Sequence, residues 1–249
     1  MATPRFFCLD LDPGIVALDE SESKHALGSL RLHAGDTAIL FDGQGRVARG
    51  VLLPAENGGK RPHREKRRRA RFEVGQVLCE LPPRCRLTLI VAGCKGPRLT
   101  WMVEKLTELG TSTIAITNFD RSVVRVGGAH EQRLRRTALQ AAKQSQRAWL
   151  PRIVCGGTPA DVVDKHAEDV LLVAHPGEGS VALGAALHRS VTSPTLTVVV
   201  GPEGGLTDAE LAYLRDRSGI PVRLARTILR VETAAISLAA HWAAQHLRV

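Results

Sequence analysis

Residues 196–205 read Leu-Thr-Val-Val-Val-Gly-Pro-Glu-Gly-Gly, and this stretch decides how the second half of the chain folds. Its uninterrupted apolar start is typical of a strand that is buried on both faces, as in a parallel sheet. In the glycine-rich segment that follows, the backbone can approach a ligand closely. Thr207-Asp208-Ala209-Glu210 comes next and matches a capping box, which predicts the start of a helix. The stretch therefore predicts a strand, a binding loop and a helix in that order.

The same alternation of strand and helix extends from residue 86 to the end of the chain. Apolar segments predict further strands at residues 87–92, 113–117, 152–155, 170–174 and 222–224. Amphipathic or alanine-rich segments predict helices at residues 99–109, 129–147 and 232–247. The outer face of the second of these helices is expected to carry its basic residues, among them Lys143 and Arg147. Apolar strands that alternate with helices imply a parallel sheet covered on both faces.

Residues 1–81 show a different, β-rich pattern. Strands are predicted at residues 6–9, 37–41, 47–53 and 72–81, and a short helix with Leu30 facing inward is predicted at 21–30. Asp42-Gly43-Gln44-Gly45 lies between two of the strands and predicts a hairpin. Pro82 and Pro83 indicate a linker, since proline interrupts a strand ladder. The sequence thus predicts a small β-domain at 1–81 followed by an α/β domain at 86–249.

The positive charge of the chain is concentrated in one segment. The formal net charge is +9, and residues 60–71 (KRPHREKRRRAR) contribute +7 of it. A basic run of this kind is either a solvated loop or a contact for a polyanion such as nucleic acid. Charge by itself leaves both interpretations open.

Several classes of protein are disfavoured by what the sequence lacks. The five cysteines show no zinc-ligand or redox spacing, so we expect reduced thiols and no bound metal. Neither a signal peptide nor a membrane-spanning apolar segment is evident, so we expect a cytoplasmic protein with no membrane contact. The glycine loop has neither Gly-Lys-Ser/Thr nor G-x-G-x-x-G, which disfavours a nucleoside triphosphate or a dinucleotide, and with it a nicotinamide oxidoreductase.

Three predicted loops follow the carboxyl ends of strands, where open α/β sheets bind their ligands. These loops are His175-Pro176-Gly177-Glu178-Gly179, Gly201-Pro202-Glu203-Gly204-Gly205, and the segment from Leu224 through Ile228-Leu229-Arg230 to Glu232-Thr233. The carboxylate of Glu203 favours a neutral or cationic ligand, such as S-adenosylmethionine, over a phosphate. A tight turn without a ligand is the alternative for the second loop, and a plain strand end is the alternative for the first.

Arg230 and Glu232 stand at the predicted start of the last helix. The helix dipole favours a carboxylate there whatever the function, whereas it disfavours a cation. Arg230 is therefore expected to pair with an internal carboxylate or with a substrate. The alanines that follow indicate close packing of this helix, either on the sheet or in a dimer interface.

Gly201-Pro202-Glu203-Gly204-Gly205 followed by Ile228-Leu229-Arg230-x-Glu232-Thr233-Ala234 resembles the paired signature of the RsmE-type 16S rRNA methyltransferases of the SPOUT superfamily. The resemblance covers nearly the whole chain. Its other segments in the second half are Lys95-Gly96, Glu104-Lys105, Thr107-Glu108-Leu109-Gly110, Arg121-Ser122, Gln144-Ser145-x-Arg147 and Pro151. In the first half, the segments that look like the family's PUA-like RNA-binding module are His25, Leu30-Arg31, Gly35-Asp36 and Phe41-Asp42-Gly43-x-Gly45.

The resemblance implies a fold, a reaction and partners. The fold is an N-terminal PUA-like β-barrel domain and a C-terminal SPOUT parallel α/β domain with a deep trefoil knot. The reaction is methylation of N3 of one uridine in 16S rRNA, within the small ribosomal subunit, by a homodimer that uses S-adenosylmethionine and no metal. The implied cofactor-binding residues are His175, Pro176, Val200, Gly201, Pro202, Glu203, Gly204, Gly205, Leu224, Ile228, Leu229 and Thr233. The implied RNA-binding residues are His25, Arg31, Lys95, Arg121, Gln144 and Arg147.

Methylation at N3 requires a nucleophile stronger than the neutral imide, so negative charge develops on the uracil carbonyl oxygens. Arg230 is the candidate to stabilise that charge, because a guanidinium stays protonated and donates in a fork. It cannot serve as the general base. Glu232 is a candidate for that role and could equally be a helix cap, so the base stays unassigned.

The sequence departs from the family pattern in a few places. Ala225-Arg226-Thr227 stands where the family usually has Gly-Pro before Ile-Leu-Arg, Lys143 stands where glutamate is common, and the basic run at 60–71 looks like an insertion. Two other functions remain open. One is a different SPOUT reaction, such as 2′-O-ribose methylation of tRNA, and the other is a non-catalytic RNA-binding protein.

Overall fold

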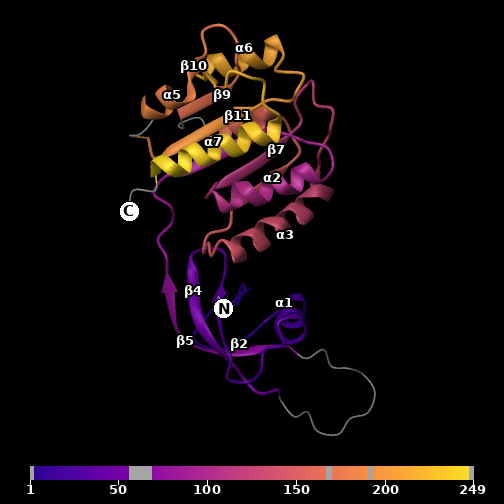
Figure 1. The fold of residues 1–249 in the computed structure, drawn as a ribbon, viewed down its shortest axis with the longest axis vertical. Coiled ribbons are helices and arrows are strands. Elements are labelled where there is room, and N and C mark those ends of the chain that lie inside the picture. The colour runs from indigo at the N-terminus through magenta and orange to yellow at the C-terminus, as the bar shows by residue number, and fades with distance from the viewer. Residues whose placement is uncertain (1–2, 56–68, 167–169, 190–192, 247–249) are drawn as a thin grey trace. The chain divides into compact units, whose positions relative to one another are not determined.

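The structure, a computed structural model, describes residues 3–55, 69–166, 170–189 and 193–246. The chain divides into two compact units (Figure 1). The N-terminal unit comprises residues 1–82 and 142–150, and the C-terminal unit comprises residues 83–141 and 151–249. Most of the basic run, residues 60–68, lies outside the described residues. Within the described ranges, no helix combines the length and apolar character needed to cross a membrane.

The N-terminal unit is built on a five-stranded sheet. Its strands are β1 (Arg5–Phe7), β2 (Gly14–Ala17), β3 (Thr37–Phe41), β4 (Arg46–Leu52) and β5 (Arg71–Cys79), in the spatial order β1-β3-β4-β5-β2. β1 and β3 pair in parallel, and the other neighbours are antiparallel. Phe6, Leu40 and Phe72 are fully buried in its core. The prediction of a β-rich first half is confirmed.

The predicted hairpin forms between β3 and β4. The Asp42 carboxylate accepts hydrogen bonds from two backbone N–H groups of the turn, at 2.7 and 3.0 Å. Gly43 and Gly45 have φ values of 75° and 95°, which side chains disfavour. A Cβ on Gly45 would also lie 2.6 Å from the ring of Trp149. Glycine at this position therefore serves both the turn and the packing of the segment 142–150 in this unit.

The helix predicted at 21–30 is divided into α1 (Glu20–Lys24) and a π-helical turn (His25–Ser29). Ala26 is buried as expected, but Leu30 is 43% exposed, so the prediction that Leu30 faces inward is wrong. The N–H of Leu30 donates to the carbonyl of His25, five residues earlier. A π turn holds more residues than an α turn, and this moves Leu30 away from the face that Ala26 occupies.

A buried ion pair anchors the segment Ala142–Leu150 in the N-terminal unit. Lys143 Nζ lies 2.9 and 2.8 Å from the two carboxylate oxygens of Glu22, and only 9% and 5% of the two side chains are exposed. The N–H of Phe7 donates to the same carboxylate at 3.2 Å. The prediction that Lys143 lies on the outer face of its helix is wrong. Helical periodicity carries no information about a partner 121 positions away.

The C-terminal unit contains a seven-stranded parallel sheet in the order β10-β12-β9-β11-β6-β7-β8. The strands are β6 (Arg86–Ala92), β7 (Thr113–Thr117), β8 (Arg152–Cys155), β9 (Val170–Ala174), β10 (Val181–Ala182), β11 (Thr195–Val200) and β12 (Ile220–Arg223). The helices are α2 (Pro97–Glu108), α3 (Gly128–Gln144), α4 (Pro159–Val163) with a 3-10 turn (Asp164–His166), α5 (Leu183–Arg189), α6 (Asp208–Asp216) and α7 (Val231–His246). The central strands β6 and β11 are buried on both faces, which confirms the prediction for this half of the chain.

The strand order of this sheet reverses between β6 and β11. The chain runs outward from β6 through β7 and β8, crosses to β9, and then places β11 beside β6. Parallel sheets bind ligands beyond the carboxyl ends of their strands near such a reversal. Helices α2 and α7 lie side by side over this part of the sheet (Figure 1).

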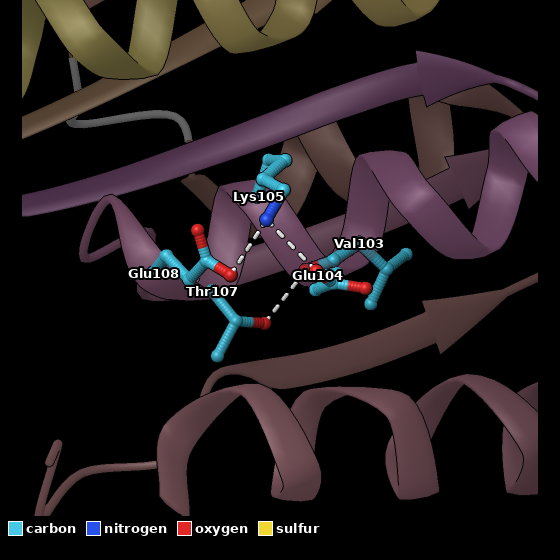
Figure 2. A network of polar contacts seen from close by, with 5 residues as sticks. All are labelled: Val103, Glu104, Lys105, Thr107 and Glu108. Atoms are coloured by element: carbon cyan, nitrogen blue, oxygen red, sulfur yellow. Dashed lines mark hydrogen bonds and ion pairs between the residues drawn. The ribbon is translucent and has the colours of Figure 1, made fainter. Parts of the chain in front are cut away.

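Helix α2 carries a compact polar network (Figure 2). Lys105 Nζ donates to Glu104 Oε1 and Glu108 Oε1, each at 2.8 Å, and these hydrogen bonds raise the pKa of Lys105. Thr107 Oγ1 donates to the carbonyl of Val103 at 2.7 Å. Lys105 therefore joins Glu104 and Glu108 within the helix, and Thr107 is bound to the helix backbone. The buried apolar residues of α2 are Leu99, Met102, Val103 and Leu106.

Candidate active site

A cavity of about 260 Å³ lies at the carboxyl ends of β9, β11 and β12 in the C-terminal unit. All three loops identified in the sequence contribute to its wall. The predicted binding residues that line it are His175, Pro176, Val200, Gly201, Pro202, Glu203, Gly205, Leu224, Ile228 and Leu229. Gly204 and Thr233 are not among the described lining residues.

The cavity also has lining residues that the sequence analysis did not identify. They are Ala174, Leu206, Val222, Ala225, Thr227, Val231 and Ala234. Each lies within or directly beside one of the three loops, so extending the loops by a residue or two would have found most of them. Among the described lining residues, Glu203 has the only carboxylate. The wall is therefore largely apolar, with one negative charge.

Arg121, in the loop after β7, supports the glycine loop. Its Nη1 donates to the carbonyls of Gly204 and Leu206, at 3.1 and 3.3 Å. The adjacent N–H of Asp120 donates to Glu210 Oε1 at 3.0 Å, which connects the same loop to the start of α6. The resemblance implied an RNA-binding role for Arg121. The structure places its guanidinium against the backbone that shapes the cavity.

The predicted capping box at the start of α6 is confirmed. The Thr207 side chain accepts a hydrogen bond from the N–H of Glu210, and Glu210 Oε2 accepts one from the N–H of Thr207 at 2.8 Å. This reciprocal pair satisfies two N–H groups that the helix itself cannot. The helix start directly after the glycine loop is thereby fixed.

Glu232 lies in the first turn of α7 and is only 4% exposed. Its Oε1 accepts a hydrogen bond from Arg98 Nη1 at 3.1 Å, and Arg98 lies in the first turn of α2. Its Oε2 is buried and has no hydrogen-bond partner among the described residues. Arg98 could not be identified from the sequence, because no local pattern relates it to a carboxylate 134 positions away.

Arg230 lies immediately before α7 and is exposed. Within the described part of the chain, its side chain has no hydrogen bond or ion pair, while its carbonyl accepts a hydrogen bond from the N–H of Ala234 at 2.9 Å. Its neighbours Leu229 and Val231 both line the cavity. We expected Arg230 to pair with an internal carboxylate or with a substrate. The carboxylate nearest in sequence, that of Glu232, is bound to Arg98 instead.

Cys94 is buried near the ion pair of Arg98 and Glu232. Burial raises the pKa of the Cys94 thiol to about 12, and the charges of Glu232 and Glu203 add to the rise. The thiolate is the nucleophilic form of cysteine, so Cys94 is inert at neutral pH.

The other residues implied to bind RNA are divided between the two units. His25, Arg31, Gln144 and Arg147 belong to the N-terminal unit, and Lys95 belongs to the C-terminal unit. Arg31, Gln144 and Lys95 are exposed, and His25 is half-buried with its ring 6.0 Å from that of Phe6.

Arg147 is half-buried, and burial lowers its pKa to about 10. The prediction that Arg147 lies on the outer face of the long helix is wrong, because α3 ends at Gln144 and Arg147 follows it.

A hollow of about 450 Å³ in the N-terminal unit is bordered by Arg31, Arg69 and Arg71. The other described residues that line it are Leu27, Leu32, His33, Ala34, Leu52, Leu53, Pro54, Ala55 and Ala70. No carboxylate occurs among these described lining residues, so the three arginines give this described lining a positive charge.

Comparison with known proteins identifies the family. Residues 81–243 match the model of an RNA methyltransferase domain. The chain is 35% identical over 242 residues to ribosomal RNA small subunit methyltransferase E of Mycobacterium bovis, covering 90% of this chain and 84% of that protein. The corresponding protein of Synechocystis sp. is 30% identical over 221 residues, covering 88% and 69%.

Solved structures agree with these matches. A ribosomal RNA small subunit methyltransferase E from Neisseria gonorrhoeae, bound to S-adenosyl methionine, superposes with a TM-score of 0.81 at 26% identity, covering 96% of each chain. A probable rRNA-methyltransferase from Porphyromonas gingivalis superposes with a TM-score of 0.79 at 28% identity. These matches, together with the parallel sheet and the cavity at three strand ends, show that this chain belongs to the ribosomal RNA small subunit methyltransferase E family.

Proposed function

We propose that this chain transfers the methyl group of S-adenosylmethionine to N3 of a uridine in 16S ribosomal RNA. The observation that carries the proposal is the cavity at the ends of β9, β11 and β12, which the family's signature loops line. Its apolar wall and the carboxylate of Glu203 suit a ligand that has both apolar and cationic parts. When bound, this cofactor supplies a methyl group that is attached to a sulfonium sulfur. The leaving group is a neutral thioether, so no metal is needed to stabilise it.

The proposal gives the chain's residues distinct roles. His175, Pro176 and the glycine loop hold the cofactor, with Glu203 placed to offset its positive charge. Arg230, exposed beside the cavity, meets the substrate and stabilises negative charge on the uracil carbonyl oxygens. The general base stays unassigned, with Glu232 as its candidate.

The proposal also covers the N-terminal unit and the assembly. The N-terminal unit is a PUA-like module that contacts RNA, and its support is the positively charged hollow bordered by Arg31, Arg69 and Arg71. The basic run at 60–71 includes Arg69 and Arg71, and contact with phosphates is the role we propose for it. We further propose a cytoplasmic homodimer with the SPOUT trefoil knot, acting within the small ribosomal subunit, because the chain resembles its relatives over nearly its whole length.

The test is a methyl-transfer assay on small ribosomal subunits that lack the modification, with a labelled methyl donor and mapping of the product. Label on uracil N3 is the expected result. Label on a ribose 2′-oxygen would identify another SPOUT reaction instead. RNA binding without any transfer would show a non-catalytic protein and contradict the proposal.

Replacing Gly201 by valine is expected to weaken cofactor binding by at least about tenfold from the micromolar range, or about 1.4 kcal/mol. A Cβ on Gly201 would lie 2.8 Å from Leu206 Cδ2, and both residues line the cavity, so the valine must displace the Leu206 side chain and change the cavity wall. Titration calorimetry measures the affinity. The matched control is Gly75→Val, because a Cβ on Gly75 meets nothing within 4 Å. Unchanged affinity in a folded Gly201→Val protein would place the cofactor elsewhere.

Replacing Arg121 by methionine is expected to weaken cofactor binding about tenfold, because charged hydrogen bonds of this kind contribute about 1.5–3 kcal/mol and the loop relaxes only in part. The carbonyls of Gly204 and Leu206 lose their donor, so the glycine loop is less well ordered. Calorimetry with the cofactor and filter binding with RNA separate the two roles of Arg121. A loss of RNA affinity with normal cofactor affinity would support the RNA-binding role that the resemblance implied.

A further inference from the structure

A surface hollow of about 630 Å³ lies at the start of α2 in the C-terminal unit, and we call it the Trp101 hollow. Trp101 is the one aromatic residue among its described lining residues, and 47% of it is exposed, whereas Trp242 in the same unit is 4% exposed. A tryptophan in this position keeps a large apolar ring available to a ligand. The described residues that line the hollow are Gly96, Pro97, Thr100, Trp101, Glu104 and Arg133.

The charge that is not paired in the Trp101 hollow is positive. Arg133 comes from α3 and is exposed, and within the described part of the chain its side chain has no hydrogen bond or ion pair. The carboxylate of Glu104, in contrast, is bound to Lys105 Nζ at 2.8 Å (Figure 2). Lys95, directly before the lining residues, is exposed and adds a second cation. The hollow therefore offers an open aromatic ring beside positive charge.

The Trp101 hollow lies on the same edge of the sheet as the candidate active site. β6 ends at Ala92 and α2 begins at Pro97, so the hollow follows the carboxyl end of a strand, as the cavity does. Arg98 in the first turn of α2 is paired with Glu232 at 3.1 Å, and Val231, the residue before Glu232, lines the cavity. Helices α2 and α7 also lie side by side (Figure 1). Nucleotides close to a target base at the cavity therefore come within reach of the hollow.

The surroundings of Trp101 suit an unpaired nucleobase better than a second copy of this chain. The core of a protein–protein interface is depleted in lysine and glutamate, whereas Lys95, Glu104 and Lys105 all lie close to Trp101 in the sequence. Pro97 is the only other apolar side chain among the described lining residues, so the ring is not part of a wider apolar surface. An aromatic ring beside cations is the usual way in which proteins bind single-stranded nucleic acid.

We propose that Trp101 stacks on an unpaired base of the RNA substrate near the target uridine, while Arg133 binds a phosphate of the same strand. This inference rests on the proposed function and adds to it a contact for RNA outside the cavity. The stack accepts any base, because every base has an aromatic face. The contact holds the strand beside the cavity, so it serves RNA affinity and leaves cofactor affinity unchanged.

The test of the stack is filter binding with a single-stranded RNA of about ten nucleotides and with an abasic strand of the same length. Trp101→Leu is expected to weaken binding of the RNA about 5- to 150-fold, the effect of losing one base–aromatic stack. Its affinity for the abasic strand should not change, because that strand has phosphates and no bases. Trp101→Phe should keep most of the affinity, since a phenyl ring still stacks.

The test of the phosphate contact is the salt dependence of the same binding. Arg133→Met is expected to weaken binding of both strands and to lower the slope of log K against log salt by about 0.7 to 1, the effect of one lost phosphate contact. The matched control is Arg136→Met, because Arg136 is exposed on the same helix and does not line the hollow. Its affinity and salt slope should equal those of the unaltered chain.

Two further measurements separate the stack from a structural role of Trp101. With small ribosomal subunits as substrate, Trp101→Leu should raise the half-saturating subunit concentration, while calorimetry shows normal cofactor affinity and sedimentation shows an unchanged oligomeric state. Normal RNA affinity of Trp101→Leu, or an equal loss on the abasic strand, would overturn this inference and leave the proposed function intact. A changed oligomeric state would also overturn it, since a second copy would then cover the hollow. Absence of methyl transfer by the unaltered chain would overturn both.

Discussion

Arg230→Ala is expected to lower turnover by about 10²–10³, equivalent to roughly 3–4 kcal/mol of transition-state stabilisation, while cofactor affinity stays within a few-fold. The side chain of Arg230 is exposed, and the carboxylate nearest in sequence, Glu232, is already bound to Arg98. Because the Arg230 guanidinium has no described anionic partner, the negative charge that it stabilises is the charge that develops on the substrate. Single-turnover kinetics on small subunits measures the loss, and calorimetry measures the cofactor affinity.

Two further variants define the role of Arg230. Arg230→Lys should restore only part of the rate, because an ammonium group does not reproduce the fork of a guanidinium. Arg226→Ala is the matched control, since Arg226 is exposed in the same loop and does not line the cavity. A normal rate for Arg230→Ala, or a joint loss of cofactor binding and stability, would assign Arg230 a structural role.

Lys143→Met is expected to lower the free energy of unfolding of the N-terminal unit by about 3–5 kcal/mol. The change leaves the Glu22 carboxylate buried without its cation, and among the described residues the N–H of Phe7 is the one donor that remains to it. Breaking one side of a buried ion pair costs far more than breaking an exposed one. Urea unfolding followed by circular dichroism measures the effect.

The control for this prediction is Arg135→Met, which breaks an exposed ion pair and should cost less than about 1 kcal/mol. The double variant Glu22→Gln with Lys143→Met should regain much of the lost stability, because no unpaired charge remains buried. Equal urea midpoints for Lys143→Met and the unaltered chain would show that the pair contributes little to this unit.

Much of the fold could be predicted because the relevant signals are local. The strands β7, β8 and β9 coincide with the apolar segments that predicted them, and the capping box of Thr207 and the turn at Asp42 form as expected. The helix at 21–30 shows the limit of such signals. A single π turn exposes Leu30, and hydrophobic periodicity assumes a uniform helix.

The three loops of the candidate site could be predicted, because strand direction decides at which edge of the sheet they lie. The loops that follow β9, β11 and β12 leave the same edge of a parallel sheet, so residues from three distant segments converge there. The sequence did not reveal which other side chains support these loops. Arg121 was assigned to RNA by resemblance, yet its guanidinium binds the backbone of the glycine loop 83 and 85 positions further along the chain.

By itself, the sequence determined the β-rich first half, the parallel α/β second half and the three loops of the cavity, because periodicity, turn residues and capping residues act over a few positions. Only the tertiary structure decided which charges pair. Lys143 is buried with Glu22, and Arg98 rather than Arg230 binds Glu232. These pairs join residues more than a hundred positions apart, so they depend on strand order and helix packing, which no local pattern encodes.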